Sequence, residues 1–367
     1  MVLSYFYPFR GGAENQALLL SDKLRHKGVD VMVLTRSFDH LPVFETIRSI
    51  PVFRAIKTVN MRTLFGARYF FSCIFFMIAK RKHYDIFHCH ILQGFHSAAA
   101  VIVGRLFKKK SIIKVASTGV TSDFKQLRQV LAGKYILRLL RKTDRLIATS
   151  GQSAAEARQE GFSDEQIRII PNGVDTLRFK PLDQYVYSRS RIVCVSRLIK
   201  GKGIDVLIDA FARLYHENIC RRLEVVGSGP EQARLVEKAA GFECAADIVF
   251  HGETAHVEDF FDNSCIFVQP SLSEGMSNVI LEAMACGLPV VATRTGAAAD
   301  IIQDSLNGML VDAGSVEQIC DAVTKIGSDE AYAQSLGSNA RKTVEDSFSI
   351  ESTVRRYREL YRELAES

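Results

Sequence analysis

The 367-residue sequence contains no tryptophan, and none of its cysteines forms the C-x-x-C spacing that zinc sites and redox motifs use. Most of the cysteines lie inside apolar runs, such as residues 192–195 and 265–268. The eight cysteines are Cys73, Cys89, Cys194, Cys220, Cys244, Cys265, Cys286 and Cys320. This scatter favours buried, reduced thiols over disulfides or zinc ligands, and it indicates the reducing cytosol as the compartment.

The first residues lack the basic stretch followed by an apolar run that marks a signal peptide, so none is predicted. The longest apolar stretch, residues 64–79, is interrupted by Arg68. It is also shorter than the roughly 20 apolar residues that a membrane-spanning helix needs. We therefore interpret it as a core helix. A shallow contact with a membrane surface is the alternative.

Charge is distributed unevenly along the chain. The net charge is +6, but residues 1–180 carry 29 Lys and Arg against 13 Asp and Glu, a net charge of +16. Residues 181–367 carry 18 against 28, a net charge of −10. A solvated face could explain one basic run, such as Lys80-Arg81-Lys82, but it explains the summed imbalance less well. The first half is therefore expected to meet something anionic, such as a charged ligand or an anionic membrane surface.

Short apolar or β-branched runs alternate with amphipathic helical stretches over the whole length. The predicted strands are 29–35, 86–90, 111–116, 145–149, 168–170, 191–196, 222–226, 247–250, 265–269, 289–292 and 308–311. The clearest predicted helices are 13–27, 206–215, 231–240, 279–286 and 350–366. Such alternation is typical of an α/β fold with parallel sheets covered by helices on both faces.

The length is comfortable for two domains of this kind. Pro171-Asn172-Gly173 supplies turn chemistry, and the stretch after it contains Pro181 without a clear period. We therefore place a hinge near residues 180–188, between an N-terminal domain at 1–183 and a C-terminal domain at 184–349. Ligands of open parallel sheets bind beyond the carboxyl ends of the strands, so the loops after strands are candidate sites.

The first such loop contains Gly11-Gly12 at the start of the helix predicted for residues 13–27. Two glycines allow a ligand to approach the backbone, and a helix N-terminus favours anionic groups. A pair of glycines is also common in plain turns, so the signal is weak by itself.

The loop after residues 191–196 carries Arg197 and Lys202 and is followed by a helix. A guanidinium can bind two phosphate oxygens at once and an ammonium acts as a point charge, so together they can neutralise a diphosphate. A solvated basic loop is the alternative. The sequence has no G-x-x-x-x-G-K-[ST] motif, so an ATPase P-loop is not indicated.

The most specific segment is PSLSEGMSNVILEAMACGLPVV, at residues 270–291. Ser277 is a suitable N-cap for a helix that Gly287 would end, which leaves free N–H groups for a phosphate. Glu274, in the loop, could contact sugar hydroxyls, and Glu282 could reach ribose hydroxyls. Two incidental surface acids are the alternative, but the apolar surroundings make an idle Glu282 costly to bury.

At these residues the sequence resembles the retaining GT-B glycosyltransferases of glycosyltransferase family 4, the glycosyl transferases of group 1. Glu274 and Glu282 form the E-x7-E pattern of that family. Further matches in the same order are GGAE at 11–14, DIFHCH at 85–90, IPNGVD at 170–175, VVGSGP at 225–230 and NGMLV at 307–311. The resemblance implies two Rossmann-like domains facing across a cleft, with the helix 350–367 returning to the N-terminal domain.

The resemblance also implies a role for each matching residue. Catalysis would use Glu274 at the transferred sugar, with Arg197 and Lys202 at the diphosphate. Substrate binding would use Gly12 at a donor phosphate, the N–H groups of Asn278 and Val279, and Glu282 at the ribose; residues 252–254 would border the base. Members of the family generally need no metal, and no D-x-D motif is present, so neither metal nor cofactor is expected.

The sequence departs from the family's pattern at Thr118, in the Ser117-Thr118-Gly119 loop where many members have a histidine beside the reacting sugar. Thr118 can hydrogen-bond a sugar hydroxyl, but it cannot act as an acid or base at neutral pH. The first predicted strand, residues 2–5, is also short, which leaves room for a missing leading segment. His88 and His90 lack Cys or Asp partners at ligand spacing, so core or cleft-wall roles are favoured over metal binding.

The expected reaction moves a hexose-type sugar from a nucleotide diphosphate, with UDP favoured, to a glycan or polyprenyl-linked acceptor in polysaccharide or glycoconjugate synthesis. It would take place in the cytoplasm or at the inner face of the membrane, without nucleic acid. Three alternatives remain: a nucleotide-sugar epimerase of the same architecture, a catalytically weak nucleotide-binding homologue, which Thr118 encourages, and a membrane-surface interaction module.

Overall fold

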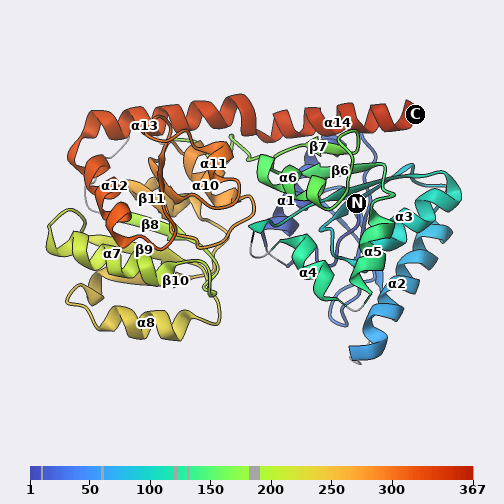
Figure 1. Ribbon diagram of the computed structural model, residues 1–367, viewed down its shortest axis with the longest axis horizontal. Helices are drawn as coiled ribbons and strands as arrows, with labels where there is room; N and C mark the ends of the chain where they lie inside the picture. Colours follow the sequence, from blue (N-terminus) through green and yellow to red (C-terminus); the bar gives the residue numbers. More distant parts are fainter. Residues whose placement is uncertain (10, 59–61, 120–121, 131, 182–190, 367) are drawn as a thin grey trace. The chain divides into compact units, whose positions relative to one another are not determined.

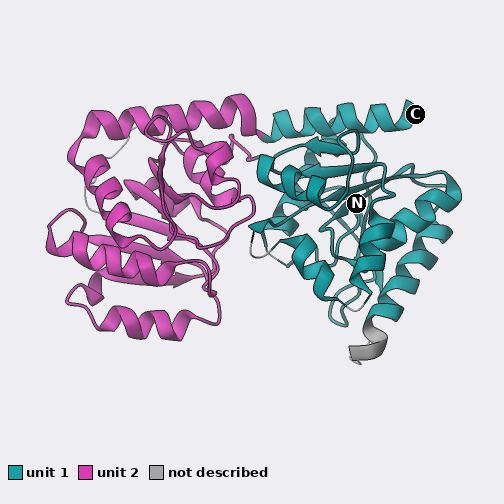
Figure 2. Cartoon of the chain, in the orientation of Figure 1, with its two compact units in different colours: residues 1–173, 350–367 teal, residues 174–349 magenta. Residues whose placement is uncertain are grey.

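The computed structural model describes residues 1–9, 11–58, 62–119, 122–130, 132–181 and 191–366, and the side chains of 62–65 are not among those described. The chain forms two compact units (Figure 2). Unit 1 comprises Met1–Gly173 with Ile350–Ser367, and unit 2 comprises Val174–Ser349. Unit 1 therefore ends before the expected boundary at residue 183, because Val174 and Phe179 pack in a core of unit 2. Most of the predicted hinge, 182–188, lies outside the described residues.

Unit 1 is a parallel sheet with one antiparallel hairpin at its edge. Its strands are β1 (Val33–Arg36), β2 (Phe44–Ile47), β3 (Ile50–Ile56), β4 (Ile86–His90), β5 (Lys110–Lys114), β6 (Arg145–Ala148) and β7 (Ile167–Ile169). They pair in the orders β1-β3-β2 and β4-β5-β6-β7. Val2 joins the two groups, because it forms parallel bridges to both Leu34 and Cys89.

Helices cover this sheet (Figure 1). They are α1 (Gly12–His26), α2 (Arg62–Ala79), α3 (Phe95–Phe107), α4 (Asp123–Gln129), α5 (Gly133–Leu140), α6 (Gly151–Gln159) and α14 (Ile350–Glu366). The carboxyl-terminal helix α14 contacts α1, and its side chains Tyr357, Leu360 and Leu364 are buried in a core shared with Leu20 and Leu24. Helices that lie far apart in the sequence thus form one layer of unit 1.

Unit 2 is a parallel sheet of six strands. They are β8 (Arg191–Val195), β9 (Arg222–Val226), β10 (Ile248–Gly252), β11 (Ile266–Gln269), β12 (Val290–Thr293) and β13 (Met309–Val311), in the order β10-β9-β8-β11-β12-β13. Two separate apolar cores pack against it. This is the doubly wound arrangement in which the strand order reverses between the first and fourth strands, here β8 and β11.

The helices of unit 2 follow its strands in turn. They are α7 (Ile204–His216), α8 (Gln232–Ala240), α9 (Glu258–Asp262), α10 (Asn278–Ala285), α11 (Ala298–Ile301), α12 (Val316–Ser328) and α13 (Glu330–Thr343), with short 3-10 and π segments at Ala245–Asp247 and Val344–Phe348. The start and end of α10 follow the sequence prediction: Ser277 caps its first turn, and Gly287, with φ of +75°, follows its last.

The sequence analysis missed the hairpin β2–β3. Its turn residues Arg48 and Ser49 have φ of +47° and +64°, which is the backbone of a two-residue turn that usually carries Asn and Gly. Arg and Ser therefore gave no turn signal. The strand expected at residues 2–5 is reduced to the bridges at Val2, and that expected at 29–35 begins only at Val33.

All eight cysteines are buried as free thiols, as predicted. The long apolar stretch is part of α2, whose Tyr69, Cys73 and Met77 are buried in unit 1. Within the described residues, no helix is long and apolar enough to cross a bilayer.

The core under α14 generates a stability prediction. The Tyr357 ring is fully buried, yet its hydroxyl has no hydrogen-bond partner among the described residues. Removing the ring by Tyr357→Ala should cost about 3–5 kcal/mol of unfolding free energy, because it opens a cavity. Removing only the hydroxyl by Tyr357→Phe should be neutral or stabilising, because an unsatisfied polar atom leaves the core. Urea unfolding of both variants measures this; a Phe variant as unstable as the Ala variant would contradict the assignment.

Candidate functional site

Two loops of unit 2 meet at the point where its strand order reverses. The loop after β8 carries Arg197 and Lys202, and the loop after β11 carries Glu274. Because β8 and β11 are adjacent parallel strands, both loops leave the same edge of the sheet. This edge is where open α/β sheets bind ligands.

The two loops are fixed to each other through their backbones. Leu272 N–H donates to Gly201 O at 2.8 Å. Gly203 has φ of +66°, and a Cβ there would lie 2.0 Å from Pro270 O. Only glycine fits at Gly203, both because the backbone is left-handed and because the neighbouring carbonyl occupies the space. The loop after β8 and the loop after β11 are therefore fixed in position relative to each other.

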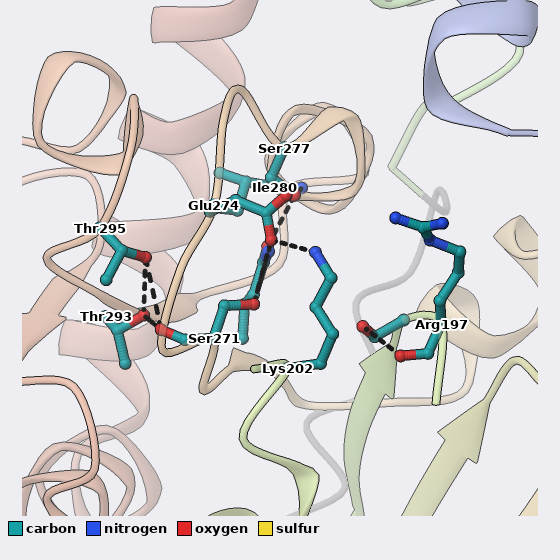
Figure 3. Close-up of polar contacts among 10 residues, drawn as sticks. Arg197, Lys202, Ser271, Glu274, Ser277, Ile280, Thr293 and Thr295 are labelled. Atoms are coloured by element: carbon teal, nitrogen blue, oxygen red, sulfur yellow. Dashed lines mark hydrogen bonds and ion pairs between the residues drawn. The ribbon is translucent and has the colours of Figure 1, made fainter. Parts of the chain in front are cut away.

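Glu274 is the centre of a compact polar cluster (Figure 3). One carboxylate oxygen, Oε2, accepts from Lys202 Nζ in an ion pair, from Gln269 Nε2 at 3.0 Å and from Ser271 Oγ at 3.1 Å. The exposed fractions of the Lys202 and Glu274 side chains are only 15% and 16%. Partial burial strengthens such an ion pair relative to a surface one, so the carboxylate is held in one orientation.

Gln269, the last residue of β11, connects this cluster to helix α10. Its amide donates to Glu274, and its carbonyl Oε1 accepts from Ser277 Oγ at 2.7 Å. Ser277 in turn accepts from Ile280 N–H at 3.4 Å and is the N-cap of α10. Gln269 therefore links the Glu274 carboxylate to the N-terminus of α10. Asn278 and Val279 lie in the first turn of α10, at the helix end that favours anions.

Arg197 lies outside the cluster. It is exposed near the start of the loop after β8, and its guanidinium forms no ion pair within the described residues. The structure therefore brings Lys202 and Glu274 together, and it places Arg197 in the same loop as Lys202 with its head group available to solvent.

Glu282 belongs to a second charged cluster, with Arg178 and Glu258. Arg178 binds Glu258 through two hydrogen bonds, at 2.8 and 3.3 Å. Burial of the Glu282 carboxyl raises its pKa to about 7, against the opposing effect of Arg178, and Glu258 adds to the rise. A buried carboxyl with a raised pKa is a candidate for a functional site.

Two candidate residues lie in unit 1. Gly12 is the first residue of the 15-residue helix α1 and is exposed. Thr118 is buried in the loop after β5. Two carboxylates hold that loop: Asp123 accepts from Ser117 Oγ at 2.6 Å, and Glu156 accepts from Gly119 N–H at 2.7 Å. Thr118 therefore sits in a defined loop at the carboxyl edge of the sheet, without the acid–base capacity of the expected histidine.

The histidines of β4 are core residues of unit 1. The rings of His88 and His90 stack with centroids 4.5 Å apart, and His88 Nδ1 is 2.8 Å from Tyr361 Oη. Burial lowers the pKa of both imidazoles well below the usual value, so they are neutral. Across the part of the chain that the structure describes, no group of three or more His, Cys, Asp or Glu could hold a metal ion.

Four residues of these sites escaped the sequence analysis: Gln269, Ser271, Arg178 and Lys114. Lys114 ends β5, is fully buried and donates to Asn172 Oδ1 at 2.7 Å, and burial lowers its pKa to about 8. Lys114 and Gln269 could have been found, because each ends an otherwise apolar strand and a polar residue is costly to bury without a partner. Arg178 gave no signal, because its partner lies 80 residues away in sequence.

Two family models match the sequence, each over one part of the chain. The model described as Glycosyltransferase Family 4 matches residues 10–178. The model described as Glycosyl transferases group 1 matches residues 187–343. The second match contains Arg197, Lys202, Glu274 and Glu282, and the first contains Gly12 and Thr118.

Among characterised relatives, the N-acetyl-alpha-D-glucosaminyl L-malate synthase of Bacillus anthracis is 25% identical over 293 residues, which cover 77% of this chain and 76% of the relative. The gpi3 subunit of the phosphatidylinositol N-acetylglucosaminyltransferase of Schizosaccharomyces pombe is 26% identical over 309 residues, covering 82% of this chain and 67% of the relative.

Similar solved structures show the fold. HepE of Anabaena, in complex with UDP, superposes with a TM-score of 0.80 at 19% identity, covering 99% of both chains. WaaG, a glycosyltransferase involved in lipopolysaccharide biosynthesis, superposes with a TM-score of 0.74 at 17% identity, covering 97% of both chains.

The Glu282 carboxyl generates a prediction about pH. A folded-state pKa of about 7, above the usual glutamate value of 4.5, means that the folded protein binds the proton more tightly than the unfolded chain. Stability is therefore lost as pH rises from about 4.5 through 7. Glu282→Gln, which resembles the protonated form, should match the parent at pH 5 and exceed it at pH 8 by about 1–3 kcal/mol.

Urea unfolding at the two pH values measures the difference. Glu237→Gln is the matched control, because Glu237 is an exposed acid on α8 of the same unit. A difference between Glu282→Gln and the parent that is the same at both pH values would contradict the raised pKa.

Proposed function

The chain belongs to the glycosyl transferases of group 1 and family 4 and is a GT-B glycosyltransferase, and from this premise we propose that it moves a sugar from a nucleoside diphosphate carrier to a glycan or lipid-linked acceptor. The observation that carries the proposal is the cluster of Lys202, Gln269, Ser271 and Glu274 at the strand-order reversal of unit 2. It combines a cation for a diphosphate with an oriented carboxylate for the transferred sugar.

The donor diphosphate is proposed to bind between the cations of the β8 loop and the first turn of α10. Arg197, with a solvent-exposed guanidinium, can bind two phosphate oxygens, and Lys202 supplies a point charge. The N–H groups of Asn278 and Val279 lie in the first turn of α10, at the end of the helix that carries partial positive charge. These groups would stabilise the negative charge that develops on the leaving nucleotide.

Two carboxylates are proposed to bind the sugars. Glu274 would accept hydrogen bonds from hydroxyls of the transferred sugar, and its three protein donors fix its orientation beforehand. Glu282 would accept from the ribose hydroxyls; its pKa of about 7 is consistent with a carboxyl whose ionised form is completed by a ligand. In unit 1, Gly12 would admit a donor phosphate and Thr118 would hydrogen-bond a sugar hydroxyl.

The reaction itself breaks the bond between the anomeric carbon and the diphosphate oxygen. A bond from the acceptor hydroxyl oxygen to the same carbon forms, and the hydroxyl proton passes to the leaving diphosphate. We propose that attack occurs on the face from which the diphosphate leaves, which retains the configuration. Glu274 is paired with Lys202 and is thereby less nucleophilic than a free carboxylate, which favours this route over a covalent intermediate.

The donor is proposed to be a UDP-sugar. HepE, of the same fold, has been solved with UDP and with UDP-glucose, and several relatives are named as N-acetylglucosaminyltransferases. Another relative is named as GDP-mannose-dependent, so donor binding is to be compared between UDP-sugars and GDP-sugars. A lipid-linked acceptor at a membrane is supported by relatives whose names specify phosphatidylinositol and by the net charge of +16 over residues 1–180.

The transfer is proposed to need neither metal nor cofactor, because two cations and a helix N-terminus are placed to neutralise the diphosphate. Activity measured after chelation with EDTA should equal the untreated activity. A loss that Mg²⁺ or Mn²⁺ restores would refute this part of the proposal.

The decisive experiment follows donor binding and turnover in a Lys202→Ala variant. UDP-sugar should raise the melting temperature of the parent, and the variant should lose at least about 100-fold in kcat/KM, because one fixed charge at the leaving group is gone. Lys200→Ala is the matched control, since Lys200 is exposed in the same loop and should retain near-parental activity. Equal activity of the two variants, or nucleotide consumption that needs no acceptor, would refute the proposal; the latter is expected of an epimerase.

Gln269 provides a separate test of the cluster. Gln269→Met keeps the volume of the side chain but removes its hydrogen bonds to Glu274 and Ser277. Because a carboxylate misplaced by about 1 Å can cost as much as 100-fold in rate, kcat should fall by about 10- to 100-fold with a smaller change in the donor KM. Steady-state kinetics on the folded variant measure the two effects. An unchanged kcat would show that Gln269 does not position Glu274.

A further inference from the structure

A continuous part of unit 1 is almost free of acidic residues. Residues 62–143, which include helices α2 to α5, contain sixteen Lys and Arg against two Asp and Glu. Of the two acids, Asp123 is buried and Asp85 pairs with Lys109 at 3.0 Å. Among the cations, Lys114 is buried and Arg128 pairs with Glu160 at 2.7 Å, but most of the others are exposed. The segment therefore presents positive charge that its own acids scarcely offset.

Large apolar side chains are exposed on the same helices. In α2, Tyr69, Cys73 and Met77 face the core, whereas Phe71 and Phe75 are 65% and 78% exposed. Their i, i+4 spacing places both phenylalanines on one outward face of the helix. The helix is thus apolar on two sides, and only one of them is covered by the protein.

The neighbouring helices extend this apolar surface. Helix α3 contacts both α2 and α5, and the three lie side by side (Figure 1). Leu106 of α3 is 68% exposed, and Tyr135 of α5 is 64% exposed. We call the surface formed by the outward side chains of α2, α3 and α5 the docking face. Exposed apolar groups of this size, interleaved with cations, are characteristic of an interaction surface.

A pocket of about 490 Å³ lies at one end of the docking face. Its lining residues are Arg128, Lys134, Tyr135, Leu137, Arg138 and Arg141. Arg128 is paired with Glu160 at 2.7 Å, and the other three cations, Lys134, Arg138 and Arg141, match a phosphate-bearing group. A tyrosine is suited to the boundary between water and lipid.

We propose that the docking face binds the surface of an anionic lipid bilayer, with the outward side chains of α2 and α3 entering the boundary of the acyl chains and the α4–α5 pocket binding a lipid phosphate. The exposed phenylalanines favour a lipid bilayer over a nucleic acid as the partner of the docking face. Base stacking uses aromatic rings between phosphate contacts, whereas Phe75 and Leu106 belong to an aliphatic and aromatic surface suited to hydrocarbon. Binding depends on buried apolar area and on attraction to anionic headgroups together.

The docking face shares no residue with the proposed donor site, because the two unit 1 residues of that site, Gly12 and Thr118, lie outside α2, α3 and α5. Failure of one proposal is therefore distinguishable from failure of the other, because transfer to a water-soluble acceptor can be measured without vesicles. In the role proposed for the enzyme, the docking face would hold unit 1 at the membrane that carries a lipid-linked acceptor.

The first test is co-sedimentation of the full chain with vesicles of phosphatidylcholine alone and with added phosphatidylglycerol. The parent should bind the anionic vesicles, and binding should decrease as salt screens the charges. Both Phe71→Ser/Phe75→Ser and Lys134→Glu/Arg138→Glu should lower the partition coefficient at least about tenfold. Glycerol phosphate added in solution should not release the protein, since it offers headgroup chemistry without a bilayer.

Matched controls come from unit 2. Val236→Ser/Leu306→Ser removes exposed apolar side chains, and Lys325→Glu/Lys342→Glu reverses exposed charges. Both controls should bind vesicles as the parent does. Equal binding of the parent to neutral and anionic vesicles, equal losses in the controls, or binding to RNA but not to vesicles would overturn the proposal.

The absence of tryptophan allows a second, independent test. Phe71→Trp introduces a single reporter at an exposed position of α2, where the substitution should not disturb the core. Its emission should shift to shorter wavelength with anionic vesicles and be quenched by brominated acyl chains. Val236→Trp should show neither effect. An emission maximum of the Phe71→Trp variant that stays unchanged with lipid would overturn the proposal even if the protein sediments with vesicles.

Discussion

The candidate site depends on one constraint: the loops after β8 and β11 approach so closely that their backbones touch. The approach requires Gly203, whose left-handed backbone lies against the carbonyl of Pro270. Two further glycines serve the same loop, since Gly227 and Gly229 lie against the carbonyls of Ser196 and Leu198. Once the loops are fixed, Lys202 reaches the carboxylate of Glu274, and the cation and acid of the site form an ion pair.

Parallel strands explain why much of this could be predicted from the sequence. Regular alternation of strands and helices predicts sheets whose loops emerge at one edge, so Lys202 and Glu274 could be expected to meet although 72 residues separate them. The limits of α10 followed from Ser277 and Gly287, because caps are local signals. Partners set by tertiary packing gave weaker signals. Gln269 was visible only as a polar residue at the end of an apolar strand, and Arg178 resembled any other surface cation. The β2–β3 turn was missed because Arg48 and Ser49 adopt a backbone that their residue types rarely take.

Charge and shape assign different tasks to the two units. Unit 2 holds its charges in compact pairs, such as Lys202 with Glu274 and Arg178 with Glu258, around the carboxyl ends of its strands. In unit 1 the cations of α4 and α5 surround an open pocket, and the few acids near them are buried or paired. Under the two proposals, recognition of the charged donor and recognition of an extended anionic surface use different side chains, so either property could change without the other.

The position of Glu282 has a calorimetric consequence. A carboxyl with a pKa of about 7 is about half-protonated at neutral pH. Any ligand whose hydroxyls donate to the ionised form lowers that pKa and expels up to about half a proton as it binds. The heat of binding then includes the heat of ionising the buffer, so titrations in phosphate and in Tris would give different apparent enthalpies for the same association. The slope of apparent enthalpy against buffer ionisation enthalpy would count the protons released when the nucleotide sugar enters.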